Sequence, residues 1–118
     1  MATNRGVQNV VKGTLQVGAL IVGPAGSVIS GLLQIAATLS PVLVAANTIA
    51  AQSVTVAGVK VGDFILSVTK PTEQAGLSLV GAARVTADNT VSLNFANDTG
   101  AGITPTASQS YTFLVWRP

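Results

Sequence analysis

The chain of 118 residues contains neither cysteine nor histidine. Without cysteine it can form no disulfide framework and no thiolate metal site. Without histidine it lacks the commonest general base and the commonest transition-metal ligand among side chains. We therefore predict that the protein is not an enzyme and that it has no catalytic, cofactor-binding or metal-binding residues.

Charged side chains are also scarce, at 8% of the residues, against about 25% in an average soluble domain. The six basic residues are scattered along the chain, whereas surfaces that bind nucleic acid carry clustered lysine and arginine. We therefore predict no nucleic-acid partner. A sparsely charged surface resists self-association poorly, which suits a subunit of an assembly; the alternative is a soluble monomer with a neutral surface.

No charge occurs between Gly13 and Val59, so membrane insertion has to be considered. A spanning helix needs about 20 predominantly apolar residues. Here glycine, proline, serine and glutamine interrupt the stretch, and its other residues favour strands. The first residues also lack the apolar segment that a signal peptide needs. We predict that the protein does not enter a membrane.

Short segments of alternating apolar and polar residues, separated by turn residues, predict an all-β chain. Strands are expected at residues 14–21, 29–39, 53–56, 64–68, 77–85, 91–95 and 111–116. Regular short strands of this kind are typical of β-sandwiches and jelly rolls. We expect a small antiparallel, jelly-roll-like sandwich over residues 14–118, preceded by a flexible polar arm at residues 1–13.

The four carboxylates, Asp63, Glu73, Asp88 and Asp98, all fall in or beside expected turns. Turn aspartates are common because their side chains accept hydrogen bonds from nearby backbone N–H groups. Turn formation therefore accounts for these residues without a catalytic pair.

Five residues are candidates for a protein interface. Arg84 lies inside an expected strand, where a charge either blocks edge pairing or serves an interface, for example as a partner of Asp63. Trp116 and Arg117 stand near the end of the chain, and both residue types are enriched at interface hot spots, although Trp116 could equally fill the core. Arg5 and Lys12, the basic residues of the arm, complete the set.

Residues 36–118 contain an ordered series of short motifs. They include Ala37-Thr38-Leu39-Ser40-Pro41, Val54-Thr55-Val56-Ala57-Gly58-Val59-Lys60-Val61-Gly62-Asp63, Ala83-Arg84-Val85, Asn97-Asp98-Thr99-Gly100, Ile103-Thr104-Pro105 and Tyr111-Thr112-Phe113. In order and spacing the series resembles a small β module of tailed-bacteriophage virion proteins, found in capsid decoration (cement) proteins and in head or tail fibres. The resemblance implies no catalytic residues.

The resemblance implies a structural virion protein made in the host cytoplasm. We expect a decoration or cement protein on the outer capsid surface, which stabilises the phage head by bridging subunits of the major capsid protein. It would also bind itself, as a homo-oligomer for which a trimer is favoured over a dimer. A head-fibre, tail-fibre or other receptor-binding or adaptor component is the alternative, and a small hydrolase has no support.

Overall fold

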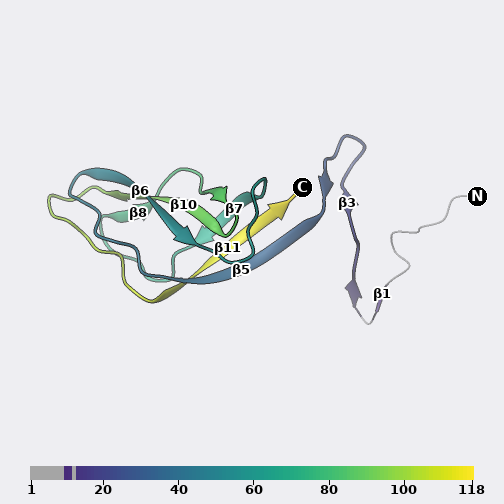
Figure 1. The fold of residues 1–118 in the computed structure, drawn as a ribbon, viewed down its shortest axis with the longest axis horizontal. Coiled ribbons are helices and arrows are strands. Elements are labelled where there is room, and N and C mark those ends of the chain that lie inside the picture. Colours follow the sequence, from purple (N-terminus) through teal and green to yellow (C-terminus); the bar gives the residue numbers. More distant parts are fainter. Residues whose placement is uncertain (1–9, 12) are drawn as a thin grey trace, which may run out of the picture.

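The computed structural model describes residues 10–11 and 13–118, and all regular structure in this part of the chain is β-strand (Figure 1). The strands are β1 (Val10–Val11), β2 (Thr14–Leu15), β3 (Leu20–Ile21), β4 (Val28–Ile29), β5 (Gly31–Leu39), β6 (Thr48–Thr55), β7 (Phe64–Thr69), β8 (Leu77–Leu79), β9 (Arg84–Ala87), β10 (Thr90–Asn97) and β11 (Gln109–Arg117). Among the described residues there is no helix of the length and apolarity that crossing a membrane requires.

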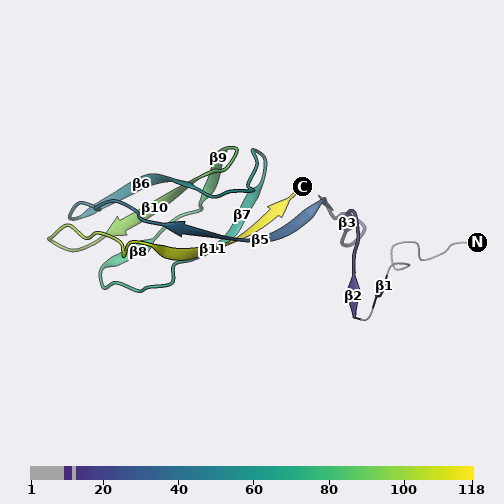
Figure 2. The same ribbon diagram turned by 60° about the horizontal axis from the view of Figure 1, so that its bottom comes forward.

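Seven of these strands form one antiparallel sheet in the order β5-β11-β7-β9-β10-β6, with β8 also paired to β10. The first long strand lies beside the last, because Gly31 pairs with Arg117 and Leu39 with Gln109. The sheet curls, so that its two edge strands, β5 and β6, approach each other (Figure 2). The expected all-β, antiparallel, sandwich-like fold is confirmed.

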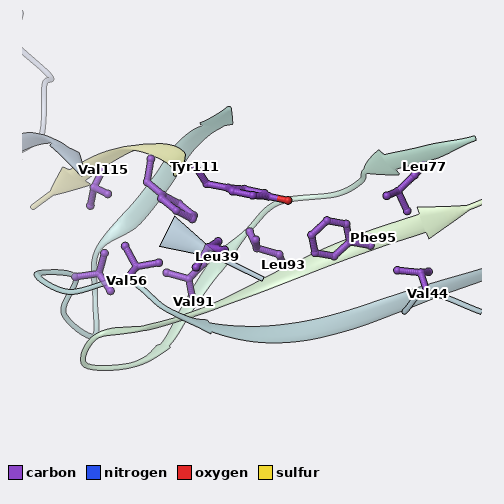
Figure 3. Packing of buried hydrophobic residues seen from close by; sticks show 11 residues of the cluster. Leu39, Val44, Val56, Leu77, Val91, Leu93, Phe95, Tyr111 and Val115 are labelled. Carbon is purple, nitrogen blue, oxygen red and sulfur yellow. The ribbon is translucent and has the colours of Figure 1, made fainter. Parts of the chain in front are cut away.

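The inner face of the curled sheet carries the hydrophobic core, shown in Figure 3. Every second residue of β10 and β11 points inward, as the period of two in these strands predicts. The buried apolar side chains are Leu39, Val44, Val56, Val59, Leu77, Val91, Leu93, Phe95, Tyr111, Phe113 and Val115. Burial of these side chains supplies the main favourable free energy of folding.

One buried polar side chain, Asn97 at the end of β10, ties two loops to this core. Its amide Nδ2 donates to the carbonyl oxygens of Val44 (3.0 Å) and Ala101 (2.8 Å). Its Oδ1 accepts from the backbone N–H of Thr99 (2.9 Å) and from the Thr99 hydroxyl (2.7 Å). All polar atoms of the Asn97 side chain therefore have hydrogen-bond partners, and this allows the side chain to be buried.

Two expected strands are interrupted in the structure. Residues 77–85 form β8 and β9 instead of one strand, because Gly81 between them has φ 67°, a left-handed conformation incompatible with a continuous strand. Residues 14–21 form only the two short strands β2 and β3, which pair with β1 and β4 and not with the main sheet. Alternation favours a strand, but a strand also needs a neighbour to pair with.

The chain therefore has two structurally different parts. The body, residues 31–118, contains the seven-stranded sheet, and the ribbon, residues 13–29, contains β2, β3 and β4. Figures 1 and 2 show the ribbon projecting from the end of the body at which the C-terminus lies. The sheet thus begins 18 residues after the expected boundary at residue 13, since Gly31 is its first residue.

Candidate protein interface

A row of outward-facing side chains crosses four neighbouring strands at the end of the body nearest the ribbon. Trp116 on β11 pairs with Leu32 on β5 and with Phe64 on β7. Phe64 in turn pairs with Arg84 on β9. Directly paired residues of an antiparallel sheet present their side chains on the same face, so Leu32, Trp116, Phe64 and Arg84 form one continuous row.

The aromatic residues of this row stack on each other. The ring centroids of Phe64 and Trp116 are 5.1 Å apart and their planes differ by 28°, a geometry in which aromatic pairs attract. Stacking fixes both rings in the row, yet Phe64 remains 52% exposed and neighbouring Leu32 remains 64% exposed. The single chain therefore leaves an apolar surface in contact with water.

A β-bulge enlarges this surface. The pairing of β7 with β11 shifts register between Leu114 and Val115, which leaves Leu66 as the extra residue on β7. A bulge re-aims side chains, and here Leu66 and Ser67 are both exposed. With Leu114, which is 37% exposed, these positions extend the row along the sheet. We call Leu32, Phe64, Leu66, Leu114 and Trp116 the outer patch.

A groove of about 350 Å³ lies beside the outer patch. It runs between β7 and the segment before β9, and its walls are largely apolar: Phe64, Ile65, Leu66, Ala82, Ala83 and Trp116 line it together with Asp63 and Arg84. Arg84 is exposed, so its guanidinium borders the groove in contact with solvent. An apolar floor with one cation at its edge suits an extended peptide segment better than a small polar substrate.

Arg117 is held by contacts within its own chain. Its Nε donates to Oδ1 of Asp63 (2.9 Å) and its Nη2 to Oδ2 of Asp63 (2.7 Å) and to the carbonyl oxygen of Gly58 (2.8 Å). Oδ2 of Asp63 also accepts from the backbone N–H of Lys60 (2.9 Å). These contacts fasten the loop before β7 to the end of β11.

The Asp63 side chain is only 2% exposed, against 28% for that of Arg117. The hydrogen bonds from the Arg117 guanidinium hold the pKa of Asp63 below its usual value. Asp63 thus pairs with Arg117 rather than with Arg84, the partner considered from the sequence.

The five predicted interface residues are distributed as follows. Arg84 and Trp116 lie in one row, joined by Phe64, and Trp116 is half-buried on the outer face rather than in the core. Arg117 lies next to them in its ion pair. Arg5 and Lys12 lie outside the described residues.

Sequence reasoning missed every member of the outer patch except Trp116. Leu32 and Leu114 occupy outward positions in β5 and β11, where alternation predicts polar residues. That mismatch was a usable signal for these two residues. For Phe64 and Leu66 there was none, because the sequence does not show the pairing with Trp116 or the bulge.

The ribbon presents a second apolar surface. Five large apolar side chains between Gln16 and Ile29 are exposed: Val17 (38%), Leu20 (48%), Ile21 (56%), Val22 (66%) and Val28 (43%). The ribbon has no charged residue, and β3 and β4 are joined by only two residue pairs. A two-stranded hairpin of this size is marginally stable in water without a surface to pack against.

The structure also shows the surroundings of the carboxylates and of possible metal ligands. Asp63 accepts a backbone hydrogen bond from Lys60 in its own turn, as predicted, whereas Asp88 accepts one from Val61 in a different loop. Residues 10–11 and 13–118 contain no cluster of three or more metal-ligating side chains.

Ser67 and Lys70 have the Ser-x-x-Lys spacing of some serine enzymes, which inspection of the sequence missed. Residues three apart on a strand point to opposite faces, and Ser67 lies in β7 with Lys70 directly after it. The Lys70 ammonium instead donates to the carbonyl oxygen of Thr72 and to Oε1 of Gln74 (3.1 Å). The spacing therefore creates no Ser/Lys pair here.

Comparison with known proteins adds no relative: no family model, no curated protein and no solved structure matches this chain.

Proposed function

We propose that the protein is a structural subunit of a larger assembly. The observation that carries the proposal is the outer patch, in which apolar side chains on one rigid sheet face remain exposed in the single chain. Contiguous apolar patches on a protein surface mark sites where other protein chains bind. The exposed apolar side chains of the ribbon add a second surface of the same kind.

The assembly that we propose is a bacteriophage head, on which the protein acts as a decoration or cement protein. The motifs of residues 36–118 that resemble virion modules all lie in the body. Subunits bound across neighbouring major capsid proteins would stabilise the shell by mass action, because they bind the assembled form in preference to its separated parts.

A fibre or receptor-binding component is the alternative. Receptor-binding surfaces are commonly built on loops, which carry binding residues on a rigid scaffold. All five aromatic residues of this chain lie in strands, namely Phe64, Phe95, Tyr111, Phe113 and Trp116. This placement favours a role in packing against an extended protein surface over recognition through loop tips.

The test uses phage particles whose genome encodes this chain. Particles stripped of the protein should lose resistance to heat and osmotic shock, and adding the purified chain should restore it. Quantitative mass spectrometry should find the protein in hundreds of copies per particle, as symmetric coverage of a shell requires. Unchanged resistance after stripping would contradict the cement role. A few dozen copies at one vertex or on the tail would support the fibre alternative.

A further inference from the structure

The outer patch and the ribbon lie at the same end of the body. Ser30 alone separates β4 from β5, and its backbone N–H donates to the carbonyl oxygen of Arg117 (2.8 Å). The next pair along the sheet joins Gly31 to Arg117, and the one after it joins Leu32 to Trp116. The ribbon therefore leaves the sheet directly beside the row that forms the outer patch.

The ribbon does not cover the patch of its own chain. Leu20 and Ile21 of the ribbon and Leu32, Phe64, Leu66 and Leu114 of the patch are all exposed in the same structure, and Figures 1 and 2 show the ribbon pointing away from the body. The single residue between β4 and β5 is itself hydrogen-bonded to β11, which holds the start of the ribbon at the end of the sheet.

We infer that the ribbon of one copy packs on the outer patch and the adjoining groove of a second copy of this chain. The inference deepens the proposed function, on which it rests, by naming a partner for the patch. The ribbon supplies what the patch lacks: exposed apolar side chains, including Leu20 and Ile21, on a segment free of charge. Packing also supplies the surface that a two-pair hairpin needs to be stable.

The second copy fits the observations better than a different protein does. Both complementary surfaces belong to this one chain, so every copy leaves a ribbon and a patch exposed until another copy covers them. The contact is heterologous, because ribbon meets patch rather than patch meeting patch. Heterologous contacts form closed rings when the rotation between copies closes, and a closed ring of three copies would be the trimer that we expect from the sequence.

Engineered cysteines give a direct test, because the chain has none of its own. One preparation carries Ile21→Cys in the ribbon and the other carries Leu66→Cys in the patch. Mixed and mildly oxidised, they should form a disulfide-linked heterodimer on a non-reducing gel. The matched control combines Ile21→Cys with Ile49→Cys, since Ile49 is also an apolar strand residue and is 67% exposed but lies on β6. Equal cross-linking to both positions, or none to Leu66→Cys, overturns the inference.

Complementation distinguishes the heterologous contact from a symmetric one. The ribbon variant carries Leu20→Ser and Ile21→Ser, and the patch variant carries Leu66→Ser and Leu114→Ser. Each should associate at least about tenfold more weakly than the unaltered chain in sedimentation equilibrium, as expected when hot-spot side chains are truncated. Mixed together they retain one intact contact, so they should form a one-to-one dimer and nothing larger. No dimer in the mixture, or an unaltered chain that stays monomeric, contradicts the inference.

Circular dichroism of each variant verifies folding, which the outward positions of all four side chains should preserve. These solution measurements are independent of the proposed function. A chain that cross-links as expected but fails to restore stripped particles would retain the ribbon contact and lose the cement role. A chain that restores stripped particles but does not cross-link would retain the cement role and lose the ribbon contact.

Discussion

The body and the ribbon are built from similar residues and end in opposite environments. In β11 the alternate residues Tyr111, Phe113 and Val115 are buried, because β11 pairs with β5 on one side and β7 on the other. In the ribbon Leu20, Ile21 and Val28 remain exposed, because β3 and β4 pair only with each other. The difference lies in the neighbours that each segment has, rather than in its composition.

This contrast explains how one sparsely charged chain can contain both a buried core and exposed apolar surfaces. The body buries the apolar side chains of its core within one chain. The ribbon has the same apolar character, but Leu20, Ile21 and Val28 stay exposed in the single chain. Substitutions in the core of the body should therefore lower the stability of the single chain, and substitutions in the ribbon or the outer patch should weaken association between chains.

The largest effect is expected in the centre of the body. Phe113→Ala removes a fully buried ring from β11 and should lower the free energy of unfolding by about 3–5 kcal/mol, the usual cost of lost burial and the cavity left behind. Urea unfolding followed by circular dichroism measures it. The matched substitution Leu20→Ala in the ribbon should change the same quantity by no more than about 0.5 kcal/mol. Similar losses for the two would mean that the ribbon packs on its own body.

The next effect concerns the polar group that ties loops to the body. Asn97→Ala removes four hydrogen bonds from a buried site and leaves the carbonyl oxygen of Val44 without its side-chain donor. We expect a loss of about 2 kcal/mol, since each intramolecular hydrogen bond contributes about 0.5–1.5 kcal/mol net, while the carbonyl oxygen of Val44 keeps its bond from the backbone N–H of Ile103. Asn94→Ala, on the same strand but facing outward, should cost clearly less in the same urea titration.

Acid should weaken the contact between the loop before β7 and the end of β11. The Arg117 guanidinium lowers the pKa of Asp63 in the folded chain, so Asp63 binds a proton more readily when unfolded. Its stabilising contribution is present above the unfolded pKa of about 3.9 and is lost as the pH falls through the folded value. Melting temperatures measured from pH 6 down to pH 2 should fall less steeply for Asp63→Asn than for the unaltered chain. Parallel curves for the two chains would mean that the ion pair does not contribute.

The strands of the body could be predicted where apolar residues on one face alternate with polar residues on the other and a turn residue stands beside them. Val91, Leu93 and Phe95 alternate with polar neighbours, and the preceding turn contains Asn89, which adopts φ 61°. The order of the strands could not be predicted in this way. The pairing of Leu39 with Gln109 joins residues far apart in the chain, and nothing local in the sequence specifies such a contact.

The candidate interface was predictable by residue type and not by position. Trp116 and Arg84 were identified because such residues are common at interfaces. Their link through Phe64 depends on the sheet register, and the exposure of Leu66 depends on a bulge. Arg117 has the right type for an interface, but the structure places it in an ion pair with Asp63.

A smaller effect of opposite sign is expected at Tyr111. Its ring is buried in the body, and its hydroxyl is buried without a hydrogen-bond partner among the described residues. Tyr111→Phe removes this unpaired group and keeps the ring, so it should raise the free energy of unfolding by about 1 kcal/mol.

Alkaline pH provides a second measurement on the same residue. Burial raises the pKa of Tyr111, so the unaltered chain should lose stability as the pH rises above the unfolded value of about 10. Tyr111→Phe should lose less over that range. A loss of stability in Tyr111→Phe at neutral pH would show that the hydroxyl has a partner after all.

The smallest effect on the single chain is expected in the ribbon, where the interesting variable is concentration. Melting temperature rises with protein concentration when folding is coupled to association. For the unaltered chain we expect such a rise, because each added copy covers a ribbon and an outer patch. At high dilution the free energy of unfolding of the variant with Leu20→Ser and Ile21→Ser should match that of the unaltered chain within about 0.5 kcal/mol. The melting temperature of the variant should not rise with protein concentration. The comparison of body and ribbon predicts this result specifically: apolar side chains with neighbours in the same chain stabilise the monomer, and those without them stabilise only the assembly.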